Sequence, residues 1–201
     1  MKISIIVLAF LLVFPAAASA QNPPIPPFYQ MSGGLFHPAQ QDFNAKYHAS
    51  SDLVWSSGMG LPLSADFLYL VAELSWFRAK GFTPGAPGTP DTSAELRHNF
   101  MHVGLMNKYF VAPALAVRFQ GGMNYNSIEE KVTPAGGTEM KRRLPRKIGF
   151  YGGIGFENLI AGGRMSVFAE AIYDYRRSVD AAMYGDFGGV RVVAGLAVYW
   201  F

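Results

Sequence analysis

The sequence predicts an all-β protein, an eight-stranded antiparallel up-and-down transmembrane β-barrel. After residue 29 the chain divides into eight segments in which apolar and polar residues alternate. Charged residues make up 15% of the chain and aromatic residues 14%, whereas a soluble domain usually carries about 25% charged residues. A helical membrane protein would need further apolar runs of about 20 residues, and the chain beyond its N-terminus has none. Strands therefore have to carry this chain across a membrane.

Residues 1–20 have the features of a secretory signal peptide. Lys2 supplies a short positive region, the stretch Ile3–Phe14 is almost entirely apolar, and Pro15 ends it. Ala18–Ala20 then offers the small residues typical of a cleavage site. We expect cleavage after Ala20 and export of the remainder; an uncleaved N-terminal anchor is the alternative. The chain contains no cysteine, which excludes both a disulfide and a lipid-modified cysteine.

The exported chain divides into a proline-rich periplasmic lead-in, residues 21–29, and the barrel, residues 30–201. The lead-in has too many prolines to donate hydrogen bonds to a sheet. In the barrel, turn-forming residues separate the alternating segments, which predict strands. The expected strands are Gln30–Phe36, Leu53–Leu61, Phe67–Lys80, Arg97–Phe110, Ala114–Ser127, Lys147–Leu159, Met165–Arg177 and Gly189–Phe201.

The fifth segment shows the alternation most clearly. Its apolar face and its polar face are Leu115, Val117, Phe119, Met123 and Tyr125 against Ala116, Arg118, Gln120, Gly122, Asn124 and Asn126. A barrel in lipid requires this arrangement, with apolar side chains outside and polar ones inside. A soluble antiparallel sandwich would alternate in the same way. Its strands are usually 5–6 residues long, whereas several segments here span 12–14 residues, which favours the barrel.

The connections between the segments alternate between short and long. Residues 62–66, 111–113 and 160–164 are short connections, and residues 37–52, 81–96, 128–146 and 178–188 are long ones. In transmembrane barrels the short turns face the periplasm and the long loops face outside. We therefore expect both termini in the periplasm. Phe43, Tyr47 and His48 of the first long loop are candidates to pack over the mouth of the barrel.

The last strand ends in Tyr199-Trp200-Phe201. A terminal Phe with a Tyr two residues before it resembles the C-terminal signature of outer-membrane barrels. With the signal peptide and the eight segments, the chain resembles the small outer-membrane β-barrel family, which includes the OmpA membrane domain and OmpX. The resemblance implies a place in the outer membrane and recognition of Tyr199 and Phe201 by the barrel-assembly machinery. It does not imply a function, because members of this family do different things.

The inward or outward phase of this last strand stays open. Two sets of residues alternate along it: Val190, Val192, Leu196, Val198 and Trp200 against Arg191, Gly195, Ala197, Tyr199 and Phe201. Hydropathy favours lipid contact for the first set, whereas the terminal Phe favours lipid contact for the second. A β-bulge would reconcile the two.

The inward faces of the strands place charges in a narrow lumen. The predicted network comprises Glu73, Arg118, Glu157, Glu170, Asp174 and Arg176, with His102 and Lys108 as further candidates. An eight-stranded barrel is just wide enough for side chains to fill it. An unpaired buried charge is very costly, so we predict that ion pairs close this lumen. Porin-like passage of small or apolar solutes is the alternative.

One segment concentrates positive charge in the third long loop or at its return to the membrane. It carries Lys141, Arg142, Arg143, Arg146 and Lys147. Basic side chains at this position would bind the phosphates of lipopolysaccharide. An adhesive patch for an acidic polymer is the sharper interpretation. No stacking aromatic residues interleave with the cluster, so we do not expect nucleic acid as a partner.

We predict no catalytic residue, no cofactor and no metal site. His98 and His102 lie on the same face of a strand but about 13 Å apart, too far to share one metal ion. A lipid-active enzyme is the third hypothesis, and it would require a Ser, a His and a carboxylate together near the outer rim. We expect instead a monomeric integral outer-membrane protein with a structural or surface-interaction role.

Overall fold

The computed structural model describes residues 26–39, 43, 47, 51–63, 67–83, 91–134, 136–143, 147–178, 185–186 and 188–200. The predicted signal peptide, most of the lead-in and Phe201 lie outside these residues. Eight long strands form the body: β1 (Phe28–Pro38), β2 (Asp52–Pro62), β3 (Leu68–Thr83), β4 (Thr92–Ala112), β5 (Leu115–Thr133), β7 (Lys147–Ile160), β8 (Met165–Tyr175) and β11 (Gly189–Tyr199). The short elements are β6 (Met140–Arg143), the 3-10 turn η1 (Ala161–Gly163), β9 (Arg177–Ser178) and β10 (Gly185–Asp186).

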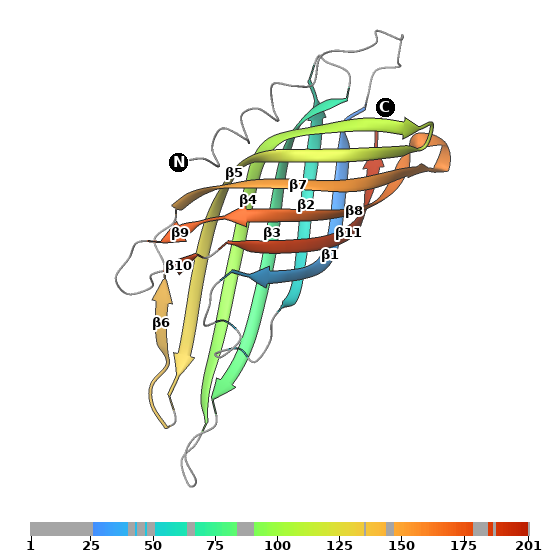
Figure 1. Ribbon diagram of the computed structural model, residues 1–201. Helices are drawn as coiled ribbons and strands as arrows, with labels where there is room; N and C mark the ends of the chain where they lie inside the picture. Colours follow the sequence, from blue (N-terminus) through green and yellow to red (C-terminus); the bar gives the residue numbers. More distant parts are fainter. Residues whose placement is uncertain are drawn as a thin grey trace.

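The eight long strands close into one antiparallel barrel (Figure 1). Each strand pairs with its neighbour in the chain, and β1 pairs with β11 from Phe28 opposite Tyr199 to Pro38 opposite Gly189. The predicted fold class and strand number are therefore confirmed. Within the described residues, no helix has both the length and the apolar character needed to span a bilayer.

The strands match the predicted segments except on one side of the barrel, where they are longer. β4 begins at Thr92, five residues before the predicted Arg97, and β5 ends at Thr133, six residues after the predicted Ser127. Much of what we expected to be the second and third long loops is thus strand. The reason is that alternation continues there with charged residues on the outward face, so the apolar pattern that marks a strand in lipid stops earlier than the strand itself. β1 also begins two residues early, at Phe28.

The long ends of β3, β4 and β5 form a sheet that extends beyond the other strands of the barrel. The last partner of β3 on β2 is Val54, opposite Phe77, and the last partner of β5 on β7 is Lys147, opposite Asn126. Beyond these pairs, and among the described residues, the strands form backbone pairs only with one another and with β6, as Figure 1 shows at its lower left. We call this sheet the extension; it comprises residues 78–83, 92–97, 127–133 and 140–143.

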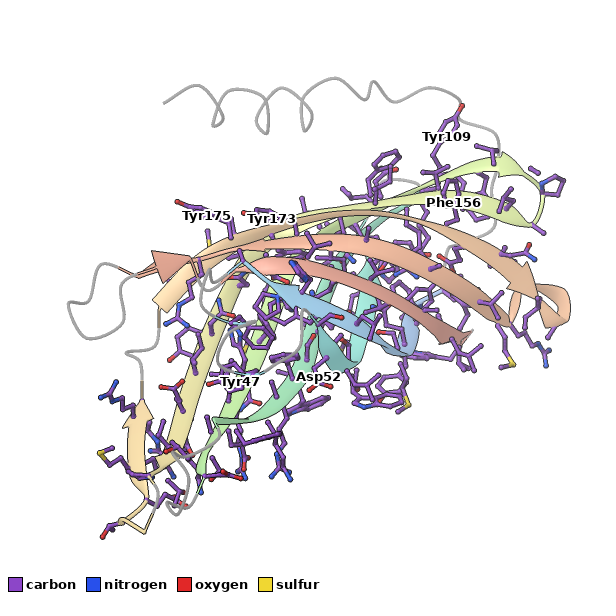
Figure 2. The ribbon with its side chains drawn as sticks, turned by 60° about the horizontal axis from the view of Figure 1, so that its bottom comes forward. Tyr47, Asp52, Tyr109, Phe156, Tyr173 and Tyr175 are labelled. Carbon is purple, nitrogen blue, oxygen red and sulfur yellow. The ribbon has the colours of Figure 1, made fainter. Side chains whose placement is uncertain are left out.

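The outer surface of the barrel is apolar and carries aromatic side chains toward both ends. Figure 2 shows Tyr173 and Tyr175 pointing away from the barrel near the long loops, and Tyr109 and Phe156 near the short turns. Each of these four side chains is more than 40% exposed, as are many outward Leu, Val, Ile and Met residues between them. A soluble protein would bury such residues, whereas a lipid-embedded barrel presents them in this way.

The structure decides the phase of the last strand. Val192, Leu196 and Val198 point outward, and Arg191 and Tyr199 point inward and are buried. The pairings of β11 with β1 and β8 run without a register shift, so no bulge reconciles the two sets. Hydropathy therefore predicts correctly which residues of this strand face outward and which face inward. Tyr199 does not face the lipid as the family signature implies, and recognition of Tyr199 and Phe201 by the assembly machinery stays a prediction.

Candidate functional site

Two apolar clusters close the ends of the lumen, one toward the long loops and one toward the short turns. The loop-side cluster is built around Phe36, Phe77 and Phe100, whose rings meet edge to face at centroid distances of 4.9–5.2 Å. The turn-side cluster is built around Phe28, Tyr69 and Phe168. Aromatic side chains are large and have few rotatable bonds, so these rings fill both ends of the lumen.

Residues of the first long loop complete the loop-side cluster. Phe43 and Tyr47 are buried, and the ring of Phe43 lies 4.8 Å from that of Tyr47 and 6.1 Å from that of Phe77. The Tyr47 hydroxyl donates a hydrogen bond of 2.6 Å to Oε1 of Glu130, on the inner face of the extension. The prediction that Phe43 and Tyr47 pack over the mouth is confirmed, and Figure 2 shows Tyr47 there. His48 lies outside the described residues.

The packing of Phe43 and Tyr47 over the mouth of the barrel, which we call the cap, gives a first testable prediction. Replacing Tyr47 with Phe keeps the ring but removes the hydroxyl that Glu130 accepts, and a buried hydrogen bond contributes about 1–2 kcal/mol. We expect the free energy of unfolding in detergent micelles, measured by urea titration, to fall by about that amount. Tyr29→Phe is the control, because the Tyr29 hydroxyl bonds to Ser57 on the exposed outer surface. Equal losses in the two variants would show that the Tyr47 hydrogen bond does not hold the cap.

Arg191 lies at the centre of the polar layer between the two clusters. Its Nε donates to Oδ2 of Asp174 at 2.8 Å, and its Nη1 donates to Oε1 of Glu73 at 3.0 Å. Nη1 also donates to Oγ of Ser75 at 2.9 Å. Nε2 of His102 lies 2.6 Å from Oδ1 of Asp174. Both acidic partners of Arg191 and the arginine itself are buried, so this group is held by its own hydrogen bonds rather than by water.

A second group of charges lies closer to the short turns and is centred on Arg118. Its Nε is 2.8 Å from Oε1 of Glu170 and 3.6 Å from Oε2 of Glu157. The guanidinium also lies over the ring of Phe168, 4.2 Å from its centroid. Nη2 of Arg118 donates to Gln30 at 2.7 Å, and Gln30 donates to Glu73 at 3.0 Å. This glutamine therefore links the second group to the Arg191 group.

Lys108 ends the polar layer on the turn side. Its Nζ is 2.8 Å from Oε2 of Glu157 and donates to the Tyr199 hydroxyl at 2.6 Å. The ammonium also lies 4.2 Å from the centroid of the Phe28 ring. Ser166 donates to Glu157 at 2.6 Å, and the Tyr199 hydroxyl donates to the same carboxylate. The polar layer thus meets the turn-side apolar cluster at Lys108.

The structure buries the predicted lumen residues inside the barrel and pairs charges of opposite sign there. Every member of the predicted network is buried. The buried charged residues are five carboxylates (Glu73, Glu130, Glu157, Glu170 and Asp174) and four cations (Lys108, Arg118, Arg176 and Arg191). The presence of both signs, paired at hydrogen-bond distance, lowers the cost of holding charges in a narrow, protein-filled space. Ion pairs inside the barrel are therefore established, as predicted.

Sequence reasoning missed Arg191, the best-connected residue of the network. The terminal Phe and hydropathy disagree about the phase of its strand, so the sequence leaves the direction of Arg191 open. A signal was present, since Arg191 alternates with Val190 and Val192, which favour the lipid side, so its charge falls on the inward face. Gln30 and Tyr199 were missed as well, because an uncharged polar residue on an inward face does not by itself indicate a partner.

The two histidines of β4 lie on the same, inward face of the strand, as the two-residue period predicts. His98 and His102 both point into the lumen, and their rings stack on that of Phe100 at centroid distances of 3.8 and 5.7 Å. Ser75, His102 and Asp174 do meet, but at the centre of the barrel, with Arg191 between the serine and the histidine. The outer-rim arrangement that the enzyme hypothesis requires is not what these residues form.

The outward face of the extension carries a lattice of ion pairs. Glu95 lies 2.8 Å from Nε of Arg78 and 2.5 Å from Nε of Arg97. Glu129 pairs with Lys141 at 2.9 Å and with Arg143 at 2.8 Å, and Lys131 pairs with Glu139 at 3.1 Å. Hydrogen bonds from Arg78 and Arg97 lower the pKa of Glu95 to about 2, so this pairing persists into acidic solution. Most carboxylates here are shared by two cations, which leaves the face positive.

The structure divides the predicted lipopolysaccharide contacts. Lys141 and Arg143 lie opposite Lys131 and Glu129 and share their outward face, whereas Arg142 lies opposite Glu130 on the other face. Arg146 lies outside the described residues, as does the side chain of Lys147. Sequence reasoning missed Arg78, Arg97 and Lys131, because they belong to segments that were expected to be strand ends and loops.

Comparison with known proteins identifies the fold. No family model and no curated protein sequence matches the chain. Among solved structures, Neisserial surface protein A is 14% identical with a TM-score of 0.55, and the match covers 87% of this chain and 97% of that one. The N-terminal β-barrel domain of Pseudomonas aeruginosa OprF is 9% identical with a TM-score of 0.55, covering 88% and 98%.

A third similar structure is Ail, the attachment invasion locus protein of Yersinia pestis, in complex with the heparin analogue sucrose octasulfate. It is 10% identical with a TM-score of 0.50, and the match covers 88% of this chain and all of that one. These three proteins share their fold with this chain, which confirms the resemblance to small eight-stranded outer-membrane barrels. At these identities, the likeness establishes the fold alone.

Proposed function

We propose that this protein is an outer-membrane barrel closed to solutes, whose role is surface interaction through the extension. The observation that carries the proposal is the filled lumen. Apolar clusters pack both of its ends, and a network of buried ion pairs occupies the middle. A barrel of eight strands has no further room for a water-filled channel once side chains occupy it in this way.

The outer surface supports the membrane location. Exposed apolar residues cover the barrel wall, and outward aromatic residues such as Tyr109 and Tyr173 lie toward its two ends. Export to that membrane rests on the signal peptide predicted for residues 1–20. The alternation of short and long connections places the extension outside the cell, where the outer leaflet carries phosphorylated lipopolysaccharide.

Among the described residues, the extension offers the surface that we propose for contact with a partner. It rises past the other strands as a paired sheet, so its side chains are held in fixed positions rather than on a loop. Its outward face is positively charged, and Arg and Lys bind phosphate by charge-assisted hydrogen bonds. Lipopolysaccharide is therefore the first partner that we propose, and we propose that the barrel acts as a monomer.

A conductance measurement tests the closed lumen. We expect residues 21–201, refolded into a planar lipid bilayer, to give no reproducible current steps. Folding is checked by the difference in gel mobility between unboiled and boiled samples, and a general porin in the same bilayer serves as positive control. Steady steps from the folded protein would overturn the closed-barrel proposal and favour solute passage.

A further inference from the structure

We propose that the outward face of β4, β5 and β7 holds one lipopolysaccharide molecule, with an acyl chain in an apolar groove and its phosphates on the charged rows of the extension. This inference rests on the proposed function and goes further, because it assigns one site and one mode of binding. It comes from two independent features, a hollow in the apolar wall and the arrangement of charge directly beyond it.

The groove is a hollow of about 280 Å³ on the outside of the barrel. It is lined by Met101, Val103, Met123, Asn124, Tyr125 and Ile148. Met101 lies opposite Tyr125, and Tyr125 lies opposite Ile148, so these three side chains form one level across the three strands. Val103 and Met123 form the next level toward the short turns. The side chain of Asn124 points inward to Asp174, so the groove itself is apolar.

The size and the lining of the groove fit a flexible hydrocarbon chain. Pockets for drug-sized ligands usually enclose about 300–1,000 Å³ and add a few converging polar groups. This groove is slightly smaller, and its two methionine side chains can adapt to an apolar chain beside the valine, isoleucine and tyrosine side chains. It also opens on the surface that we place in lipid, where acyl chains surround the barrel.

Two positively charged levels lie beyond the groove, toward the outside, after one uncharged level. The first outward level beyond the groove is uncharged and contains Asn99 opposite Ser127. The next level contains Arg78, Arg97, Glu129 and Arg143, and the one after it contains Lys80, Glu95, Lys131 and Lys141. Each of these two levels has three cations and one carboxylate, and Glu139 adds one more carboxylate beside Lys131.

The spacing of these levels suits one amphipathic molecule. Arg97 is four residues from Met101 along β4, which is about 13 Å in a strand. Long Arg and Lys side chains reach back toward the bilayer and shorten that span. A lipid whose acyl chain occupies the groove would thus bring its phosphates to the first charged level. Two cationic levels exceed what a single phosphate needs, which favours a glycolipid with several phosphates over a phospholipid.

The test uses the refolded full-length mature chain and purified lipid A that carries two phosphates. Native mass spectrometry in detergent micelles measures how much lipid A stays bound as its concentration is varied. Val103→Trp fills the groove, and its control is Val192→Trp, an equally outward valine on β11. The double variant Arg97→Gln/Arg143→Gln removes two cations, and its control is Arg164→Gln at the exposed turn between β7 and β8.

We expect Val103→Trp and the double arginine variant each to weaken lipid A binding by about tenfold, the effect of losing one good contact, with both controls unchanged. Phosphatidylglycerol should compete poorly. If only the arginine variant weakens binding, the proposed function stands and the groove is overturned as the acyl site. If neither variant weakens binding, this site and lipopolysaccharide as the partner of the extension are both overturned, whereas the closed lumen is tested separately by conductance. Equal competition by phosphatidylglycerol would replace lipopolysaccharide by any anionic lipid and overturn the inference.

Discussion

Replacing Arg191 with Met should cost about 3–5 kcal/mol of the free energy of unfolding. The substitution leaves Glu73 and Asp174 buried without the guanidinium that now lies 3.0 and 2.8 Å from their oxygens. Breaking a buried pair by removing one partner is this costly because the remaining charge is uncompensated. Urea titration of the refolded barrel in detergent micelles, followed by tryptophan fluorescence, measures the loss.

Arg97→Met is the matched control. Arg97 is also paired, at 2.5 Å from Glu95, but its side chain is 46% exposed. Exposed ion pairs contribute about 0–1 kcal/mol, since water and salt screen them. A triple variant that adds Glu73→Gln and Asp174→Asn to Arg191→Met should regain part of the lost stability, because no charge is then left alone. If Arg191→Met and Arg97→Met cost the same, the lumen network does not hold the barrel closed.

Gly155→Val should destabilise the barrel by about 3 kcal/mol, the upper end of what overpacking usually costs. Gly155 points into the lumen, where a Cβ would lie 2.3 Å from Cγ of Glu170 and 2.4 Å from the carbonyl oxygen of Ala169. The side chain can shift, but the carbonyl cannot move without breaking the pairing of β7 with β8. The same urea titration measures the effect.

Gly152→Val, on the same strand, separates this clash from any general effect of replacing a strand glycine. Gly152 points outward, and a Cβ there would meet nothing closer than a carbonyl oxygen at 3.9 Å. We expect a change within about 0.5 kcal/mol, or a small gain, because valine favours strands and suits the lipid surface. A loss at Gly152 as large as that at Gly155 would argue against the close approach of β7 and β8 inside the lumen.

The strand period accounts for what sequence reasoning predicted about the site. Side chains alternate strictly across a strand, so placing Leu70 outside places Glu73 and Ser75 inside without any knowledge of the fold. The same reasoning identified Arg118, Glu157 and Asp174 as lumen residues. It was weakest for the extension, where the outward face changes from apolar to charged at Arg97 and the pattern that defines a strand in lipid is lost.

The sequence by itself determined the fold class, the number of strands and the inward face of most of them. The reason is that, in a barrel in lipid, the side that a residue faces decides whether it is apolar or polar. Only the tertiary structure decided which inward residues meet. Arg191 and Glu73 are 118 positions apart and come together only through barrel closure. Strand tilt and stagger set which inward residues share a level, and they depend on all eight pairings at once. The groove and the charged rows beyond it likewise exist only where β4, β5 and β7 lie side by side.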